Sequence, residues 1–246
     1  TLIASDIRPL NPQALRPNVE AALLDIGKRE AVLAAVAQHQ PDAIVHLASV
    51  VTPPPGMGED VLHAIDVEGT RSILQAAVEH GVRQLIVTSS GAAYGYYPEN
   101  AEWIDEHDPL RGHSKFAYAK HKREVEEMLA QARVKHPELR QLILRPGTIL
   151  GRHVNNQITD MFKKKAVMGI SGSDSRFVFI WDQDVVSIII KGLEKGCSGI
   201  FNLAGDGALS LREIAEVLQK LYRPLAAGLV QFGLRLLRPL GLTWYG

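Results

Sequence analysis

The chain has 246 residues, 46% apolar and 22% charged, which suits a domain with a full buried core and excludes a disordered, collagen-like or coiled-coil protein. The 27 Lys and Arg balance the 27 Asp and Glu, so no overall charge attracts nucleic acid or an anionic membrane. Cys197 is the single cysteine, which excludes an internal disulfide and a cysteine-based metal site. We expect a soluble, cytoplasmic protein that binds a small-molecule substrate, with no nucleic acid, no membrane and no metal.

The order of apolar runs predicts strands that alternate with helices. In chain order we expect a strand over 1–6, a strand over 19–24, a helix over 28–40, a strand over 43–48, a helix over 59–80, a strand over 84–88, a helix over 113–135 and a strand over 140–145. Elements alternating in this way form right-handed crossovers around a parallel sheet. We therefore predict an α/β protein with a doubly wound parallel sheet over 1–150, whose ligand lies at the carboxyl ends of the strands.

Beyond residue 150 the elements become shorter and the connections more polar. This change predicts a smaller, substrate-binding region over 151–246, with some elements returning to the main sheet. Asp182 and Asp184 precede an apolar helix over 185–193, and we expect them to cap it. The apolar stretch 225–242 is interrupted by arginines, so we interpret it as an amphipathic helix rather than a membrane segment.

The strongest local signal is a tyrosine and a lysine four residues apart, Tyr118 and Lys122, on a predicted helix. That spacing places both side chains on one face, one turn apart. A free phenol, with a pKa of about 10, is a poor base at neutral pH, but a nearby ammonium stabilises its phenolate. The pair therefore has the composition of a group that exchanges protons with a substrate hydroxyl. Taken alone, a tyrosine followed four residues later by a lysine is also a common pattern on helix surfaces, so a pair without function is the alternative interpretation.

The predicted strand over 84–88 ends in Thr-Ser-Ser-Gly-Ala-Ala-Tyr-Gly, residues 88–95, which places hydroxyls at the ligand edge of the sheet. Serines that only cap a turn are the alternative. Together with Tyr118 and Lys122, these features resemble the extended short-chain dehydrogenase/reductase family, in its NAD-dependent epimerase/dehydratase branch, which has a Rossmann-like fold. The resemblance extends from residue 1 to about 221. It implies that Ser90, Tyr118 and Lys122 form the catalytic group.

The same resemblance implies an NAD site along the carboxyl edge of the sheet. Asp6 corresponds to the family's acid that holds the adenosine ribose hydroxyls, and its charge would repel a 2′-phosphate, so NAD is favoured over NADP. Arg8 is the residue that would favour NADP instead. The other implied cofactor-binding positions are Asp25, Ile26, Leu47, Ala48, Ser49, Thr88, Tyr118, Lys122 and Pro146. The expected substrate-binding positions are Ser90, Gly91, Tyr118, Asn155 and Arg176.

Three of the polar residues have structural interpretations as well. Asp25 has the alternative of a polar loop residue, and His46, inside an apolar strand, is interpreted as a core histidine with a hydrogen-bond partner. Asp66 stands where the family's Asn-Val-x-Gly-Thr segment has its asparagine, which leaves its role open.

Two departures from the family pattern concern the phosphates and the substrate. The family's phosphate-binding loop, G-x-x-G-x-x-G, does not follow the first strand, and the segment 56–58 lacks the third glycine of that motif. We therefore interpret the chain as lacking an upstream stretch of roughly 30 residues, the size of one strand-helix unit. Sugar-nucleotide members commonly have an arginine seven residues before the acid that opens the next helix. Counting back from Asp184, that place holds Phe177, with Arg176 one position away.

The implied reaction is hydride transfer between a secondary hydroxyl and NAD, most commonly on a nucleotide sugar. A dehydrogenase of a steroid-like or other hydrophobic alcohol is one alternative, and a non-catalytic cofactor-sensing or scaffold protein is another. The predicted helices over 59–80 and 113–135 correspond to those that pair across a twofold axis in the family. The first carries more apolar residues than one sheet-facing stripe requires, so we also expect a homodimer.

Overall fold

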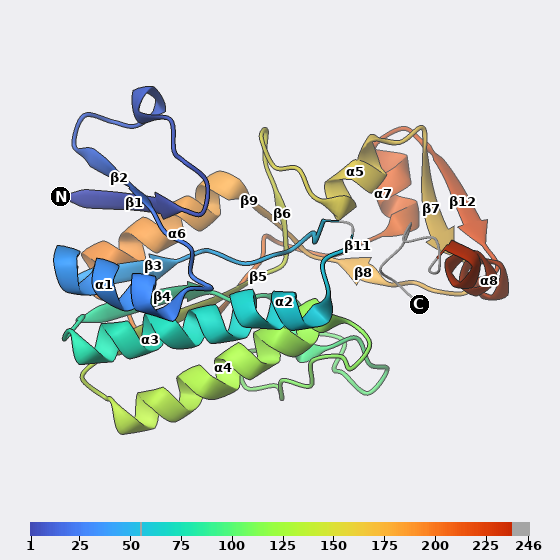
Figure 1. The fold of residues 1–246 in the computed structure, drawn as a ribbon. Helices are drawn as coiled ribbons and strands as arrows, with labels where there is room; N and C mark the ends of the chain where they lie inside the picture. The colour runs from blue at the N-terminus through green and yellow to red at the C-terminus, as the bar shows by residue number, and fades with distance from the viewer. Residues whose placement is uncertain (55, 238–246) are drawn as a thin grey trace.

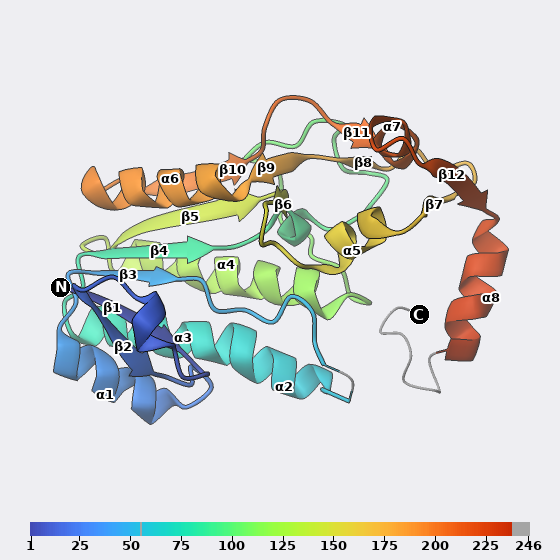
Figure 2. The same ribbon diagram turned by 90° about the horizontal axis from the view of Figure 1, so that it is seen from above.

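A computed structural model describes residues 1–54 and 56–237. Its centre is a four-stranded parallel sheet in the order β10-β5-β4-β3, formed by Gly199–Leu203, Arg140–Pro146, Gln84–Thr88 and Ala43–His46 (Figures 1 and 2). The two central strands are buried almost throughout, as continuous apolar strands of a parallel sheet should be. The predicted α/β architecture is confirmed.

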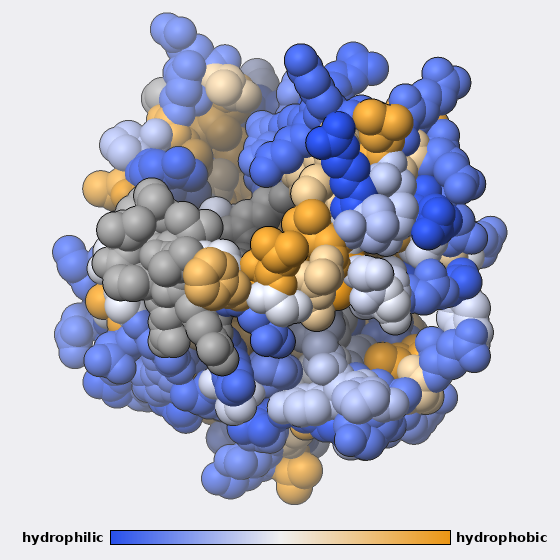
Figure 3. Space-filling view, turned by 90° about the vertical axis from the view of Figure 1, so that its right-hand side faces the viewer, coloured by the Kyte–Doolittle hydropathy of each residue, from blue (hydrophilic) through white to orange (hydrophobic). Residues whose placement is uncertain are grey.

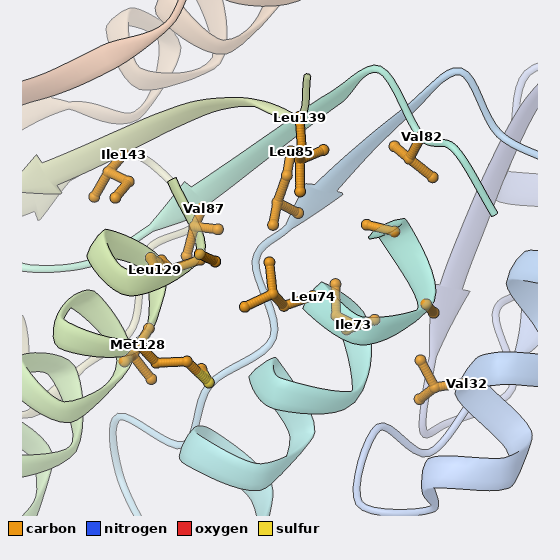
Figure 4. Close-up of a cluster of buried hydrophobic side chains, with 14 of the residues drawn as sticks. Val32, Ile73, Leu74, Val82, Leu85, Val87, Met128, Leu129, Leu139 and Ile143 are labelled. Carbon is orange, nitrogen blue, oxygen red and sulfur yellow. The ribbon is translucent and has the colours of Figure 1, made fainter. Parts of the chain in front are cut away.

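Helices cover both faces of this sheet. α1 (Arg29–His39), α3 (Gly69–Glu79) and α4 (Ala117–Lys135) lie on one face and α6 (Asp182–Glu194) lies on the other (Figure 1). Figure 4 shows the core under the first layer, with Leu85 and Val87 of β4 facing Leu74 of α3 and Leu129 of α4. A second apolar cluster lies between the sheet and α6. The sheet is therefore fixed on both faces, which gives its carboxyl edge a defined geometry.

The first two strands form a ladder of their own. β1 (Leu2–Asp6) pairs in parallel with β2 (Val19–Leu23), and the short 3-10 turn η1 (Pro12–Ala14) lies between them in the chain. Within the described residues this pair shares no ladder with β3. The expectation of one continuous sheet over 1–150 therefore applies only from β3 onward.

The predicted helix over 59–80 is a continuous run with one wide turn. α2 (Glu59–His63) passes into a π-helical segment, η2 (Ala64–Glu68), and then into α3. The apolar side chains of this run include Leu62, Ile73, Leu74 and Ala77, which are buried within the chain. Most of the apolar surface that we expected to form a dimer contact is therefore packed inside the subunit. Val61, 49% exposed, is the large apolar side chain of this run that stays open to solvent.

Several predicted boundaries differ from the observed ones, most clearly those of β3, α4 and α6. β3 ends at His46, two residues earlier than expected, and α4 begins at Ala117 rather than 113. Phe116 is the N-cap of α4 and has extended backbone angles, φ −131° and ψ 93°, so the helix begins only after it. Asp182 and Asp184 lie within the first turn of α6, whose N-cap is Trp181 with no side-chain cap bond. They complement the helix dipole instead of capping the helix.

Residues beyond 146 form small paired strands around short helices. β6 (Thr148–Leu150) pairs with β9 (Phe179–Trp181), β7 (Ala166–Ile170) with β12 (Leu221–Leu225), and β8 (Arg176–Phe177) with β11 (Leu209–Ser210). The helices are α5 (Gln157–Lys163), α7 (Leu211–Val217) and α8 (Ala227–Leu237). β10 and α6 return to the main sheet.

The end of the molecule that carries α8 exposes large apolar side chains, among them Leu221, Leu229 and Phe232. Figure 3 shows apolar surface gathered in the middle of this face, within a hydrophilic surround. The predicted helix over 225–242 is observed as α8 up to Leu237, and the remainder, 238–246, lies outside the described residues. None of the described helices is long and apolar enough to cross a membrane.

Candidate functional site

The carboxyl end of β4 brings the predicted catalytic residues together. The strand ends at Thr88, and Ser90 then caps the 3-10 turn η3 (Gly91–Tyr94), with its hydroxyl accepting a 3.1 Å hydrogen bond from the amide of Ala92. Tyr118 lies in the first turn of α4, near enough to Ser90 for that side chain to lower the pKa of the phenol. Lys122, one turn further along α4, donates to the carbonyl of Thr88 at 3.1 Å.

Burial decides the protonation of the tyrosine. It raises the pKa of Tyr118 to about 12, and the Ser90 side chain opposes this shift only in part. Lys122 Nζ lies 5.5 Å from the centroid of the Tyr118 ring and is directed to the Thr88 carbonyl. The sequence-based expectation that the ammonium lowers the tyrosine pKa is therefore not met in this arrangement, and Tyr118 carries its proton at neutral pH.

Lys122 is itself deeply buried, with 6% of its surface exposed. Burial lowers its pKa below the ordinary value for lysine, while the carboxylates of Asp66 and Glu126 raise it. A buried ammonium needs such counter-charges because its hydration is lost.

A buried ion pair lies behind the catalytic group. Glu126, one turn beyond Lys122 on α4, accepts bonds of 2.7 to 3.0 Å from the guanidinium of Arg145 on β5. Glu126 also accepts a 2.5 Å bond from Ser89, and Arg145 Nη1 donates to the Tyr94 hydroxyl at 2.6 Å. This network joins α4, β5 and the Ser89–Ser90 segment into one rigid unit.

Asp66 forms hydrogen bonds with the segment that follows β3. Its carboxylate accepts bonds from the hydroxyl of Ser49 at 3.0 Å and the amide of Val50 at 2.9 Å. His46 is buried and bonds through Nε2 to the Thr70 hydroxyl at 2.9 Å, which confirms its interpretation as a core histidine with a partner. Burial lowers the pKa of His46 to about 4, so it is neutral.

The predicted cofactor positions lie at or just after the carboxyl ends of successive parallel strands. Asp6 ends β1 and accepts a bond from the amide of Arg8 at 2.8 Å; the Arg8 guanidinium lies 3.6 Å from the same oxygen. Leu47, Ala48 and Ser49 follow β3, Thr88 ends β4, and Pro146 ends β5. The exposed carboxylate of Asp6 suits an adenosine ribose, but these positions include no glycine-rich turn for a pyrophosphate.

Two of these positions also have structural roles. The carboxylate of Asp25 accepts a bond from the amide of Gly27 at 3.0 Å, which closes a local turn. The side chain of Ile26 packs against the main core cluster. Their roles toward a cofactor stay predictions.

The expected substrate positions divide into two groups. Gly91 lies beside Ser90, in a place where a Cβ would come within 3.7 Å of the Pro146 carbonyl. The side chain of Asn155 accepts a bond from Lys163, and Arg176 bonds to Asp174 and the carbonyl of Ala208. Among the described residues neither bonds to the catalytic group, so their place in a substrate site stays a prediction.

A cavity of about 420 Å³ has none of Ser90, Tyr118 and Lys122 among its lining residues. Side chains of β9 and α6 line it, including Phe179, Trp181, Ile188 and Lys191. We place the candidate site by its chemistry, at the carboxyl edge of β4.

Sequence reasoning missed His121, Glu126 and Arg145. Two signals were available. Glu126 follows Lys122 by four residues and so shares its helix face, and Arg145 is a charge inside an apolar strand, which requires a buried partner.

Comparison with known proteins places this geometry in a family. A family model described as the NAD dependent epimerase/dehydratase family matches residues 3–204. The N-acetyl-alpha-D-glucosaminyl-diphospho-ditrans,octacis-undecaprenol 4-epimerase of Escherichia coli O157:H7 is 29% identical over 164 residues, which are 64% of this chain and 48% of that protein. The uronate dehydrogenase of Pseudomonas syringae pv. tomato is 34% identical over 116 residues, 47% of this chain and 40% of that protein.

Solved structures agree on the fold. The UDP-glucose 4-epimerase of Thermus thermophilus, solved with NAD, superposes with a TM-score of 0.72 and 22% identity, covering 88% of this chain and 75% of that one. The chain spans about half the length of the curated relatives it matches. The resemblance noted from the sequence is confirmed, and the chain belongs to the NAD-dependent epimerase/dehydratase family.

Proposed function

We propose that this chain provides the catalytic group of an NAD-dependent oxidoreductase or epimerase that acts on a secondary hydroxyl of a sugar. The observation that carries the proposal is the placement of Ser90 directly after β4 at the carboxyl edge of the sheet, with Tyr118 in the first turn of α4 and the Lys122 ammonium, bonded to the Thr88 carbonyl, one helical turn further on. Two curated relatives with 29% and 34% identity are named as enzymes that act on sugar derivatives, which supports a sugar as the substrate class.

The residues divide the chemistry among them. Ser90 hydrogen-bonds the reacting oxygen, and Tyr118 exchanges a proton with it. Because Tyr118 is protonated at neutral pH here, it is ready to donate that proton to a carbonyl oxygen. In the oxidative direction Tyr118 must first lose its proton to solvent, and the resulting phenolate then accepts the hydroxyl proton of the substrate. A bound NAD would supply the hydride acceptor for oxidation of the carbinol carbon and, in its reduced form, the hydride donor for the reverse step.

The residues present fit NAD at its two ends. Asp6 offers a partly exposed carboxylate for the adenosine ribose, and we propose that Lys122, one turn after Tyr118 on α4, contacts the nicotinamide ribose. A nucleotide sugar is the narrower substrate proposal. Asn155 and Arg176 are the proposed substrate contacts outside the catalytic group. Net oxidation, as in a dehydrogenase, is the second candidate, favoured by the uronate dehydrogenase relative.

Tyr118→Phe tests the proposal, because it removes one oxygen and keeps the ring. With the intact protein, sugar nucleotides and uronic acids are screened for NADH formation and for inversion at a carbinol carbon. We expect Tyr118→Phe to lower kcat at least a hundredfold while NAD binding is retained. Turnover that survives this substitution would contradict the mechanism, and a protein that binds NAD but converts none of these substrates would support the non-catalytic alternative.

A further inference from the structure

Three aromatic side chains form a row at the amino-terminal end of α4. Phe116, the N-cap of the helix, has its ring centroid 5.9 Å from that of Tyr118, and the ring of Tyr96 lies 6.1 Å from that of Phe116. Both separations fall within the range in which aromatic pairs attract each other. The row therefore begins at the proposed catalytic phenol and continues over two rings that the mechanism above does not use.

The backbone around Gly95 determines where Tyr96 lies. Gly95 has a φ of 79°, and a Cβ there would come within 2.0 Å of the Gly112 carbonyl oxygen, so only glycine permits this close approach. The next ring, Tyr97, stacks on His113 with 5.3 Å between centroids. The segment after η3 is thus held against the segment before α4, and this contact brings Tyr96 to the aromatic row.

Exposure to solvent is greatest at the outer end of the row. Phe116 and Tyr118 are partly buried, whereas 63% of the surface of Tyr96 is exposed. Tyr96 is also close enough to Tyr118 for the charge of its ionised form to raise the pKa of that phenol. An exposed tyrosine beside a reactive group presents an apolar ring and a polar hydroxyl to a ligand.

The chemistry of the row suits a neutral ring rather than an anionic group. Two neighbouring cations are directed elsewhere, since Lys120 bonds to Glu59 at 3.0 Å and Arg111 bonds to the side-chain oxygen of Asn100 at 3.3 Å. The face of an aromatic ring carries partial negative charge, and the C–H groups on one face of a pyranose are weakly positive. Binding sites for small molecules commonly combine such aromatic surfaces with a few polar groups.

We propose that Tyr96 and Phe116 form an aromatic platform on which the sugar ring of the substrate lies while its reacting hydroxyl meets Ser90 and Tyr118. Tyr96, the most exposed of the three rings, is the specificity-determining residue of this platform. The sugar as substrate class rests on the proposed function. Binding of a sugar ring to the platform, however, requires no turnover and is tested separately.

Saturation-transfer NMR is the direct test of the platform. The aromatic protons of the intact protein are irradiated, and transfer to the sugar-ring protons of UDP-glucose and of D-glucuronate is measured. We expect transfer to the sugar ring of at least one probe, and a reduction of about threefold or more in Tyr96→Leu. Absence of transfer from the unmodified protein to the sugar protons of both probes would overturn the proposal.

Trp103→Leu is the matched control, because Trp103 is a 67% exposed aromatic side chain on the same connection between η3 and α4, outside the row. It should retain full transfer. Equal transfer in Tyr96→Leu and Trp103→Leu, whether retained or lost, would contradict the assignment to Tyr96. Urea unfolding checks that Tyr96→Leu is folded. If it is not, Phe116→Leu removes the other ring of the platform and should show the same loss.

Turnover of the sugar that the unmodified protein converts gives the second measurement. Tyr96→Leu should raise KM about tenfold with kcat changed less than about twofold, and Tyr96→Phe, which keeps the ring, should restore KM. A fall in kcat with KM unchanged would overturn the proposal, because it would assign Tyr96 to the proton transfer. The NMR experiment needs no turnover, so it still decides the platform if Tyr118→Phe contradicts the proposed function.

Discussion

Asp6 illustrates how one side chain sets a preference between two cofactors. Its carboxylate lies at the end of β1, beside the exposed Arg8 guanidinium at 3.6 Å. An acid at this position accepts bonds from two ribose hydroxyls, whereas a 2′-phosphate there places like charges together. Arg8 would have to move over the phosphate, and Asp6 away from it, to reverse that preference.

We predict that the intact protein binds NAD at least tenfold more tightly than NADP, a difference of about 1.4 kcal/mol. Calorimetric titration with both cofactors measures it. Asp6→Ala should reduce the difference between the NAD and NADP affinities, chiefly by improving NADP binding. Equal affinities in the unmodified protein would mean that Arg8 determines the pocket.

His46 makes stability depend on pH. Burial lowers the pKa of His46 from 6.5 to about 4. Between these two pH values the imidazole is therefore protonated in the unfolded chain and neutral in the folded chain. The stability that His46 contributes is therefore fully present above pH 6.5 and is lost as pH falls toward 4.

Because of His46, the free energy of unfolding should fall by up to about 3 kcal/mol as the pH falls from 6.5 to 4. Urea unfolding at pH 7.5 and pH 4.5 checks this. The difference between the two pH values should be smaller in His46→Asn than in the unmodified protein. His107→Asn, at a side chain that is 96% exposed, is the control and should retain the full difference.

At the scale of elements, α4 is the part that organises the site. Tyr118, Lys122 and Glu126 follow each other at intervals of four residues, so one helix face carries the proton donor, the ammonium and the carboxylate that anchors the helix to β5. The anchor is the pair with Arg145, in which both side chains are at most 3% exposed. Removing one partner leaves the other charge buried and unmatched.

We predict that Glu126→Leu or Arg145→Met alone lowers the free energy of unfolding by about 3–5 kcal/mol. The double variant should be less destabilised than the sum of the two, with a coupling of about 1 kcal/mol or more. Urea unfolding of the four proteins gives the double-mutant cycle. Additive single effects would show that the pair is not coupled.

At the scale of the molecule, assembly is open to a direct test. Most apolar residues of α2 and α3 are buried within the chain, so a homodimer through these helices and α4 depends on the smaller exposed surface around Val61. We retain the predicted twofold dimer, since isologous pairing needs only one self-complementary face.

Light scattering of the intact protein at micromolar concentration should give twice the subunit mass. Val61→Glu should shift the protein toward one subunit mass, while Val217→Glu, at an exposed valine on α7, should not. A single subunit mass for the unmodified protein would reject the dimer.

The sequence by itself determined the alternation of strands and helices, because apolar periodicity reports local geometry directly. The four-residue spacing of Tyr118 and Lys122 predicted that they share a helix face, and the strand end predicted that Ser90 lies at the ligand edge, whereas the family resemblance implied that the three act together. Only the tertiary structure decided the protonation of Tyr118, the separate ladder of β1 and β2, and the burial of Glu126 with Arg145. Those outcomes depend on desolvation and on partners distant in the chain, which no local pattern encodes.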